Sequence, residues 1–363
     1  MIYYFFFFSL ITTTIAFFSL RVSAIILVIG CSVFLYLLPP SVGGDYSIYQ
    51  NAVENSYVSK EYPWFKTEAG FSSEPLYLFY SSLLGVLLFK GYKLFMIANF
   101  IICYLISFLA LRRCPYKNIF FFFWIATLPV IFPTIFYGSP RSSISFFFVL
   151  AGFFLLVDMK YLLSFCCFSL GVSFHSQYLF SSGVIISCYF LLKNSRNISK
   201  KLILYSLLAL ISICLFNIKF VLGLILFVFS FLPSGDIASA KMHYFEDARS
   251  GIRFTSILSI FVYPILIYLF RSVKQVFFFK EEEKEHMAKN LFLAMILSAG
   301  ILNIIFFNNP HVAGRLSRFS DYSSLTLLVP IFFLAKSNSK TTVLTILFII
   351  NLISPLIYKS IYY

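Results

Sequence analysis

Long apolar runs separated by short polar turns dominate this chain. Each run is apolar on all sides of a helix, and none alternates apolar with polar positions as a strand of a membrane β-barrel does. Runs such as 2–20, 119–137 and 341–358 are close to the about 20 residues that a helix needs to cross the hydrocarbon core of a bilayer. The pattern therefore predicts an all-α polytopic membrane protein.

The runs predict about twelve membrane-spanning helices. They cover residues 2–20, 22–38, 94–111, 119–137, 142–157, 161–174, 178–192, 202–218, 254–270, 290–307, 322–335 and 341–358. Two further runs, 76–89 and 220–232, are short for a span, which is typical of re-entrant or interfacial helices. No linker or internal repeat divides the chain, so we expect a single integral membrane domain over residues 1–363.

The positive charges in the turns favour the count that leaves out both short runs. Between residues 90 and 219, that count places eight Lys and Arg on the cytoplasmic side and four outside: Arg112, Arg113, Lys117, Lys160, Lys193, Arg196, Lys200 and Lys201 against Lys90, Lys93, Arg141 and Lys219. Cytoplasmic loops carry the excess of Lys and Arg in membrane proteins. We therefore expect both termini and the loops 39–75, 233–253 and 308–321 on the outer side. The charged segment 271–289 is expected to be a cytoplasmic helix.

Composition narrows the possible functions. The chain is 60% hydrophobic and only 12% charged, about half the charged share of soluble domains, which is about 25%. Its net charge of +14 lies mostly in short loops, where it sets topology, so a nucleic-acid partner is not indicated. Six of the seven Cys fall in apolar runs and Cys114 lies in a basic turn, so neither a disulfide framework nor a metal site is indicated. We expect no cofactor and no metal.

Two arginines stand out in the polar segment between the apolar runs 290–307 and 322–335. Arg315 and Arg318 are three residues apart, so on a helix both project from one face, with Asp321 and Tyr322 just behind them. An Arg at the bilayer centre costs about 2.5–3.5 kcal/mol on insertion scales, and its planar fork matches two phosphate oxygens. The pair points to a phosphate-bearing substrate delivered from the membrane. Ordinary snorkelling of an Arg at a helix end is the alternative.

Other polar residues fall at span ends on the same outer side, which allows them to line one cavity. They are Asp45, Glu74, Arg141, His175, Arg249, Arg253, Arg315, Arg318 and Asp321. Each also has a structural alternative. Asp45 can cap a helix, Glu74 suits a helix start before Pro75, and His175 can be an interfacial residue. Arg249 and Arg253 can form surface pairs with nearby acidic residues.

The order of these motifs resembles a known family. Gly44-Asp45-Tyr46 followed by Tyr49, and then Glu74-Pro75-Leu76-Tyr77, resemble the GxDxxxY and EPGY elements of the EpsG-like, Wzy-type polysaccharide polymerases. Arg141, followed by Phe174-His175-Ser176, is similar to that family's R…FH pair, and Arg318 with Tyr322 to its late R…Y element. The resemblance covers roughly residues 40–335. Leu76 and Ser142 depart from the family's usual Gly and Gln.

The resemblance implies a GT-C-like, metal-independent glycosyltransferase of the bacterial inner membrane. Such an enzyme joins repeat units linked to undecaprenyl diphosphate into O-antigen or exopolysaccharide on the periplasmic face, and a protein that controls chain length is an expected partner. On this hypothesis, Arg141, Arg315 and Arg318 bind the diphosphates, with Arg249, Arg253, Asp321 and Tyr322 as further substrate contacts. His175 is the first choice of base, with Asp45 or Glu74 competing. Tyr46, Tyr49 and Tyr77 either stack on sugars or anchor the chain at the interface.

Three other functions remain open. An O-antigen ligase uses the same donor but normally has one large late periplasmic loop, whereas 233–253 is small. A sugar O-acetyltransferase favours His and Arg near its first spans, where residues 1–38 hold only Arg21. A flippase or transporter hides charges in mid-span, whereas here they gather at span ends.

The topology makes a direct prediction. Reporter fusions placed after Lys90 and after Lys219 should both report the outer side, with high alkaline phosphatase activity and low activity of a cytoplasmic reporter. A fusion within the charged segment 271–289, which both counts place on the cytoplasmic side, serves as the cytoplasmic control. Cytoplasmic activity at both Lys positions would favour a count of fourteen spans, in which both short runs cross.

Overall fold

The computed structural model of the chain is described for residues 2–37, 46–61, 64–67, 74–112, 118–130, 132, 136, 138–194, 267, 282–306, 314–337 and 339–362. These residues fall into two compact units. The first comprises residues 1–178, 275–285 and 322–363, and the second comprises residues 179–274 and 286–321. The expected runs 202–218, 220–232 and 254–270 lie outside the described residues, apart from residue 267.

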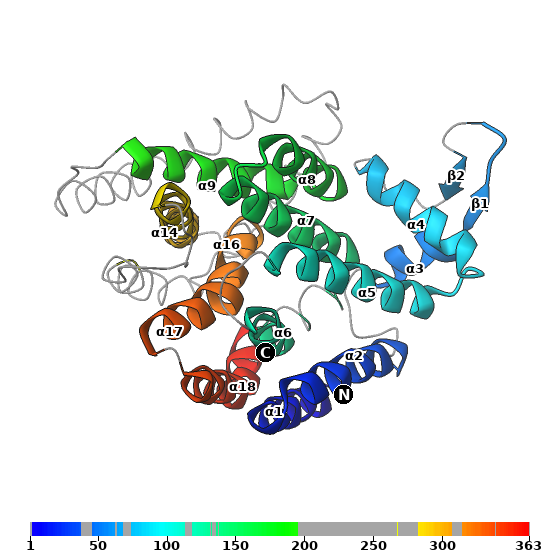
Figure 1. Cartoon of the computed structure of the whole chain (residues 1–363). Helices are drawn as coiled ribbons and strands as arrows, with labels where there is room; N and C mark the ends of the chain where they lie inside the picture. The colour runs from blue at the N-terminus through cyan, green and yellow to red at the C-terminus, as the bar shows by residue number, and fades with distance from the viewer. Residues whose placement is uncertain are drawn as a thin grey trace. The chain divides into compact units, whose positions relative to one another are not determined.

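Helices make up most of the first unit (Figure 1). In chain order they are α1 (Ile2–Phe18), α2 (Leu20–Leu37), α3 (Tyr46–Glu54), α4 (Pro75–Leu87), α5 (Tyr92–Leu111), α6 (Ile119–Val130), α7 (Pro140–Val157), α8 (Tyr161–Phe174), η3 (Ser324–Leu328), α17 (Val329–Ser337) and α18 (Lys340–Tyr362). The second unit holds most of α9 (Gln177–Asn194) and of α14 (Glu282–Ile305). The helix α16 (Arg318–Ser323) begins in the second unit and ends in the first.

The chain is a membrane protein. Among the described residues, four helices are long and apolar enough to cross a bilayer, namely α2, α5, α7 and residues 283–305 of α14. The helices α1, α4, α6, α8 and α18 contain shorter apolar stretches. The number of spans and the GT-C-like arrangement stay predictions.

A polar seam joins the first helix to the last. In α18, Asn351 Nδ2 donates to Thr13 Oγ1 of α1 at 3.0 Å, and Ser9 Oγ donates to Asn351 Oδ1. All three side chains are buried. Within a bilayer such hydrogen bonds are a main source of helix association, because lipid is as apolar as the helix surface.

Small residues let α7 and α8 pack closely. A Cβ added at Gly171 of α8 would come within 2.6 Å of Val149 Cγ2 and 3.2 Å of the Ser145 carbonyl oxygen of α7. Ser145 Oγ donates to the Gly171 carbonyl at 2.5 Å, and Ser164 Oγ donates to the Gly152 carbonyl at 2.8 Å. The close contact brings the end of α8 beside the start of α7.

The described part of the segment 39–75, which was predicted to be an outer loop, contains structure that the sequence analysis missed. Strands β1 (Ser56–Val58) and β2 (Phe65–Thr67) pair antiparallel and pack against α4, as Figure 1 shows. A Cβ at Gly85 of α4 would come within 2.6 Å of the Val53 carbonyl oxygen, so this approach requires glycine. The short helix α3 packs on α4 and α5. The protein is therefore not purely helical as predicted, because it contains this small β-hairpin.

The helix α4 has 13 residues, as short as the sequence suggested, and forms a helical hairpin with α5. At its end Phe89 and Lys90 adopt φ values of 53° and 62°. The N–H of Lys90 bonds to the Gly85 carbonyl at 2.6 Å and that of Phe89 to the Val86 carbonyl at 3.3 Å, which is the Schellman pattern that glycine usually terminates. A left-handed non-glycine residue costs about 1–2 kcal/mol.

Three element boundaries differ from expectation. Residues 282–289 of the predicted charged segment 271–289 are not a separate helix, because the helix formers Glu, Lys and Ala there continue into the apolar run as α14. Residues 271–281 lie outside the described residues, and the cytoplasmic location stays a prediction. In the run 119–137, the α-helix α6 covers Ile119–Val130, and the described residues 132 and 136 beyond it are π-helical. The late helix starts at Arg318 rather than 322, and it continues through the π-helical turn η3.

Replacing Asn351 with Ala should lower the free energy of unfolding by about 0.6–1.7 kcal/mol, the range for interhelical hydrogen bonds in membranes. The measurement is unfolding in mixed micelles titrated with denaturing detergent. Thr345→Ala on the exposed side of α18 is the matched control and should change stability little, since its hydroxyl bonds only within its own helix. Equal stability of Asn351→Ala and wild type would show that the seam adds nothing.

Candidate functional site

The carboxylate of Glu74 lies at the centre of a buried polar cluster. Oε2 accepts a hydrogen bond from Arg141 Nη1 at 2.8 Å, and Oε1 lies 2.6 Å from His175 Nδ1. The backbone N–H of Ser176 donates to Oε1 at 3.4 Å. Only 2% of the Glu74 side chain is exposed, against 19% for Arg141 and 10% for His175. We call these three side chains the Glu74 cluster.

The pattern of bonds assigns the proton on His175. The Glu74 carboxylate is ionised, because the positive charge of Arg141 at 2.8 Å favours the charged form. An ionised carboxylate only accepts hydrogen bonds. Nδ1 of His175 is therefore the donor to Glu74, and in a neutral imidazole Nε2 is then left with the lone pair that can take a proton.

Three helix ends supply the cluster. Glu74 precedes α4, whose first residue, Pro75, has a fixed φ that suits a helix start and needs no N–H partner. Arg141 lies in the first turn of α7, and His175 caps the end of α8 with an extended backbone. The close packing of α7 on α8 brings the last two together.

Tyrosines and serines enclose Arg141. Its guanidinium lies over the ring of Tyr49 of α3, 5.7 Å from the ring centre, which is a favourable cation–π geometry. The Tyr49 hydroxyl bonds Ser139 Oγ at 3.1 Å, and Ser139 Oγ in turn bonds Ser142 Oγ at 2.9 Å. The Tyr178 hydroxyl donates to the Ser142 carbonyl at 3.2 Å. The start of α7 is therefore held from both sides.

The predicted tyrosines are not at the surface. Tyr49 and Tyr77 are fully buried, with ring centres 5.8 Å apart, so stacking on a sugar would require both rings to become exposed. Tyr46 packs edge-on against Tyr92 at 4.8 Å. Burial, and then the nearby Glu54, raise the pKa of the Tyr46 phenol above its ordinary value, so this group stays neutral at physiological pH.

The Glu74 cluster lies beside α5, some distance along the helix from its first residue. In α5, Asn99 accepts from the Tyr80 hydroxyl at 3.0 Å and donates to Ser143 Oγ at 2.7 Å, within two residues of Arg141. Asn99 comes seven residues (99 − 92) after Tyr92, the first residue of α5. At 1.5 Å per residue the cluster is therefore about 10 Å along α5 from its start.

The remaining predicted residues belong to other parts of the chain. In the second unit, Asp321 accepts from Asn303 Nδ2 at 3.1 Å and from Ser317 Oγ at 2.6 Å. The Nε of Arg318 is buried and has no hydrogen-bond partner among the described residues; Arg315 lies just before it and is partly exposed. Tyr322 follows in α16, where its carbonyl accepts from Thr326 Oγ1. Asp45, Arg249 and Arg253 lie outside the described residues.

Sequence reasoning missed the residues that hold the cluster. Asn99, Ser139 and Tyr178 were not singled out, and Ser142 was noted only as a departure from the family's usual Gln, although the serines of the run Arg-Ser-Ser-Ile-Ser after Pro140 are unusual in an otherwise apolar helix. That signal marks a helix face that meets other polar groups. Within the described residues no group of three or more His, Cys, Asp or Glu side chains is arranged to hold a metal ion.

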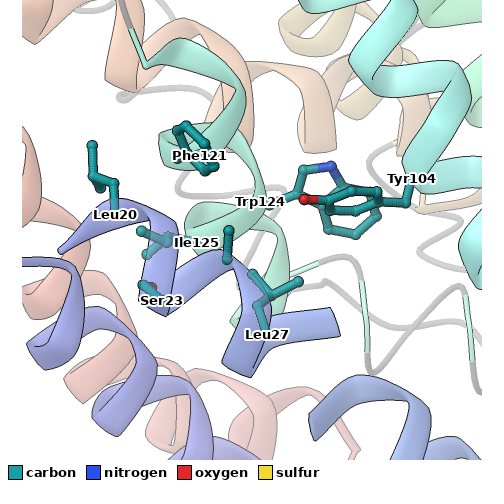
Figure 2. Close-up of a pocket in the computed structure, with 8 residues that line it drawn as sticks. Leu20, Ser23, Leu27, Tyr104, Phe121, Trp124 and Ile125 are labelled. Carbon is teal, nitrogen blue, oxygen red and sulfur yellow. The ribbon is translucent and has the colours of Figure 1, made fainter. Parts of the chain in front are cut away.

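A small crevice elsewhere in the first unit is not this site. Figure 2 shows its lining from α2, α5 and α6, which is mainly apolar, with Leu27, Tyr104 and Trp124 among the residues. Its free volume of about 10 Å³ is about that of one water-sized sphere. The crevice is too small for a sugar or a lipid chain.

Comparison with known sequences identifies the family. The sequence model of the EpsG family matches residues 23–363, nearly the whole chain. Neither the curated proteins nor the solved structures contain a match.

The buried ion pair makes a stability prediction. Glu74→Ala should lower the free energy of unfolding by about 3–5 kcal/mol, because it leaves the Arg141 guanidinium buried without its acid. The double variant Glu74→Ala/Arg141→Ala should be less destabilised than the sum of the two single variants. The measurement is a double-mutant cycle of unfolding in mixed micelles, and strictly additive losses would show that the pair is not coupled.

Proposed function

Starting from its membership of the EpsG family, a family of Wzy-type polysaccharide polymerases, we propose that this chain joins oligosaccharide repeat units carried on undecaprenyl diphosphate. The reaction takes place on the periplasmic face of the bacterial inner membrane and yields O-antigen or exopolysaccharide. The observation that carries the proposal is the shared carboxylate of Glu74, which orients a histidine base and neutralises an arginine at one buried point.

The proposed reaction is a glycosyl transfer. A hydroxyl of the acceptor sugar attacks the anomeric carbon of the donor glycan, the C–O bond to the lipid diphosphate breaks, and the lipid diphosphate leaves as an anion. The hydroxyl proton goes to Nε2 of His175, whose other nitrogen is fixed by Glu74. In this scheme Glu74 positions His175, and it does not itself take the proton from the acceptor hydroxyl.

Charge balance decides how the arginines are used. The diphosphate repels a nearby carboxylate, and Glu74 already neutralises Arg141 at 2.8 Å. We therefore propose that Arg141 mainly holds Glu74 in place. Arg315 and Arg318 remain the proposed diphosphate ligands, supported by the buried Nε of Arg318. Preorganised guanidiniums lower the barrier by stabilising the charge that develops on the leaving group.

The test is the length of the glycan made in cells. In a strain deleted for the gene, His175→Ala, Arg141→Ala and Arg318→Ala should each leave glycans of a single repeat unit, and the loss of one donor to the leaving group should slow polymerisation by about 10²–10³-fold. Thr345→Ala at matched expression is the control with normal chains. Normal polymer from all three variants would remove the proposed site, and a strain with no glycan on its carrier core would favour a ligase or a flippase.

A further inference from the structure

The tip of the α4–α5 hairpin, residues 87–93, displays apolar side chains on a strained backbone. Phe89 has a φ of 53° at a position that usually holds glycine, yet the residue is 93% exposed. Leu87, two residues earlier, is 59% exposed. In water this arrangement combines backbone strain with an exposed aromatic ring. If an apolar environment surrounded the tip, the exposure of the aromatic ring would become favourable instead of costly.

Two apolar spans end at the same level as this tip. The ammonium group of Lys93, in the first turn of α5, lies 5.3 Å from the centre of the Tyr36 ring in the last turn of α2. Both helices are long and apolar enough to cross a bilayer. Tyr, Trp and Lys are the residues that gather at the boundary between membrane and water. The Tyr36–Lys93 pair therefore marks that boundary.

We propose that this tip inserts into the interfacial layer of the bilayer. Phe89 and Leu87 lie within this layer, where aromatic side chains gather, while Lys90 and Lys93, both exposed, meet anionic lipid headgroups. The partner is the lipid surface itself. The assignment to the outer leaflet rests on the proposed function, whereas the insertion does not.

The insertion sets the depth of the Glu74 cluster. Each headgroup layer is about 5–8 Å thick, the difference between a bilayer of about 40–45 Å and its 30 Å core. With the tip in that layer, a cluster about 10 Å farther along α5 lies near the hydrocarbon boundary. At that depth a lipid diphosphate joins its hydrocarbon chain. The insertion of the tip would thus fix the depth of His175 in the membrane at the level of a membrane-embedded substrate.

The test uses tryptophan fluorescence in nanodiscs of phosphatidylcholine and phosphatidylglycerol. The emission of Phe89→Trp minus that of wild type isolates position 89, because the native Trp64 and Trp124 cancel. Bromine near the lipid headgroup should quench this added emission more strongly than bromine near the chain end, because an aromatic side chain in the interfacial layer lies close to the headgroups. Leu105→Trp, a half-exposed position in the middle of α5, is the control that deep bromine should quench best.

Two quenching results would overturn the inference. Strong quenching by aqueous acrylamide with no effect of brominated lipid would place the tip in water. Protection from both quenchers would show that another protein surface covers it. Because the assay needs no turnover, its result is separate from the fate of the proposed polymerase activity.

A functional readout complements the fluorescence. Phe89→Glu should shorten the glycan chains made in cells severalfold, while Phe89→Leu keeps them near normal length. Phe89→Gly removes both the strain and the ring, so it should be at least as stable as wild type in detergent but make shorter chains. Normal chains from both Phe89→Glu and Phe89→Gly would overturn the role of the tip in setting depth.

Discussion

One carboxylate shared between a guanidinium and an imidazole is the constraint on which the site depends. Glu74 is almost completely buried, so its charge is tolerated only while Arg141 and His175 both remain in place. The reverse also holds, because Arg141 lies at the start of α7, where the helix dipole opposes a cation. Three helix ends are therefore fixed relative to one another by a single acid.

The packing around this acid explains how the ends meet. Gly171 and Ser145 allow α7 and α8 to approach closely, which brings Arg141 and His175 together. Asn99 ties the same end of α7 to α5 and, through Tyr80, to α4. Polar side chains within apolar helices thus perform two tasks at once. They hold the helices together, and they leave the imidazole of His175 oriented for proton transfer.

The sequence predicted the members of this site better than their arrangement. Glu74, Arg141 and His175 were recognisable because charged residues at the ends of apolar runs on one side of a membrane are costly unless they meet partners. Their contacts span 67 and 101 residues of sequence, and no local rule gives such pairings. The burial of Tyr49 beneath Arg141 and the serine bridge through Ser139 depend on the same packing.

Some helix boundaries could be predicted from the sequence, whereas other local features could not. The run 161–174 matches α8, because Lys160 and His175 interrupt the apolar sequence on both sides. The β-hairpin between α3 and α4 was missed, since strands of three residues carry too few alternating positions to be detected. The left-handed Phe89 was also missed, because Gly91 nearby is the residue that would be expected to end α4.

The most direct measurement of the central claim is the turnover number of purified protein in nanodiscs supplied with lipid-diphosphate-linked repeat units. If Glu74 acts through His175, Glu74→Gln and His175→Ala should each reduce kcat with little change in KM, and the double variant should be no slower than His175→Ala alone. Losses in kcat that multiply in the double variant would show that the two residues act independently, and would contradict the account.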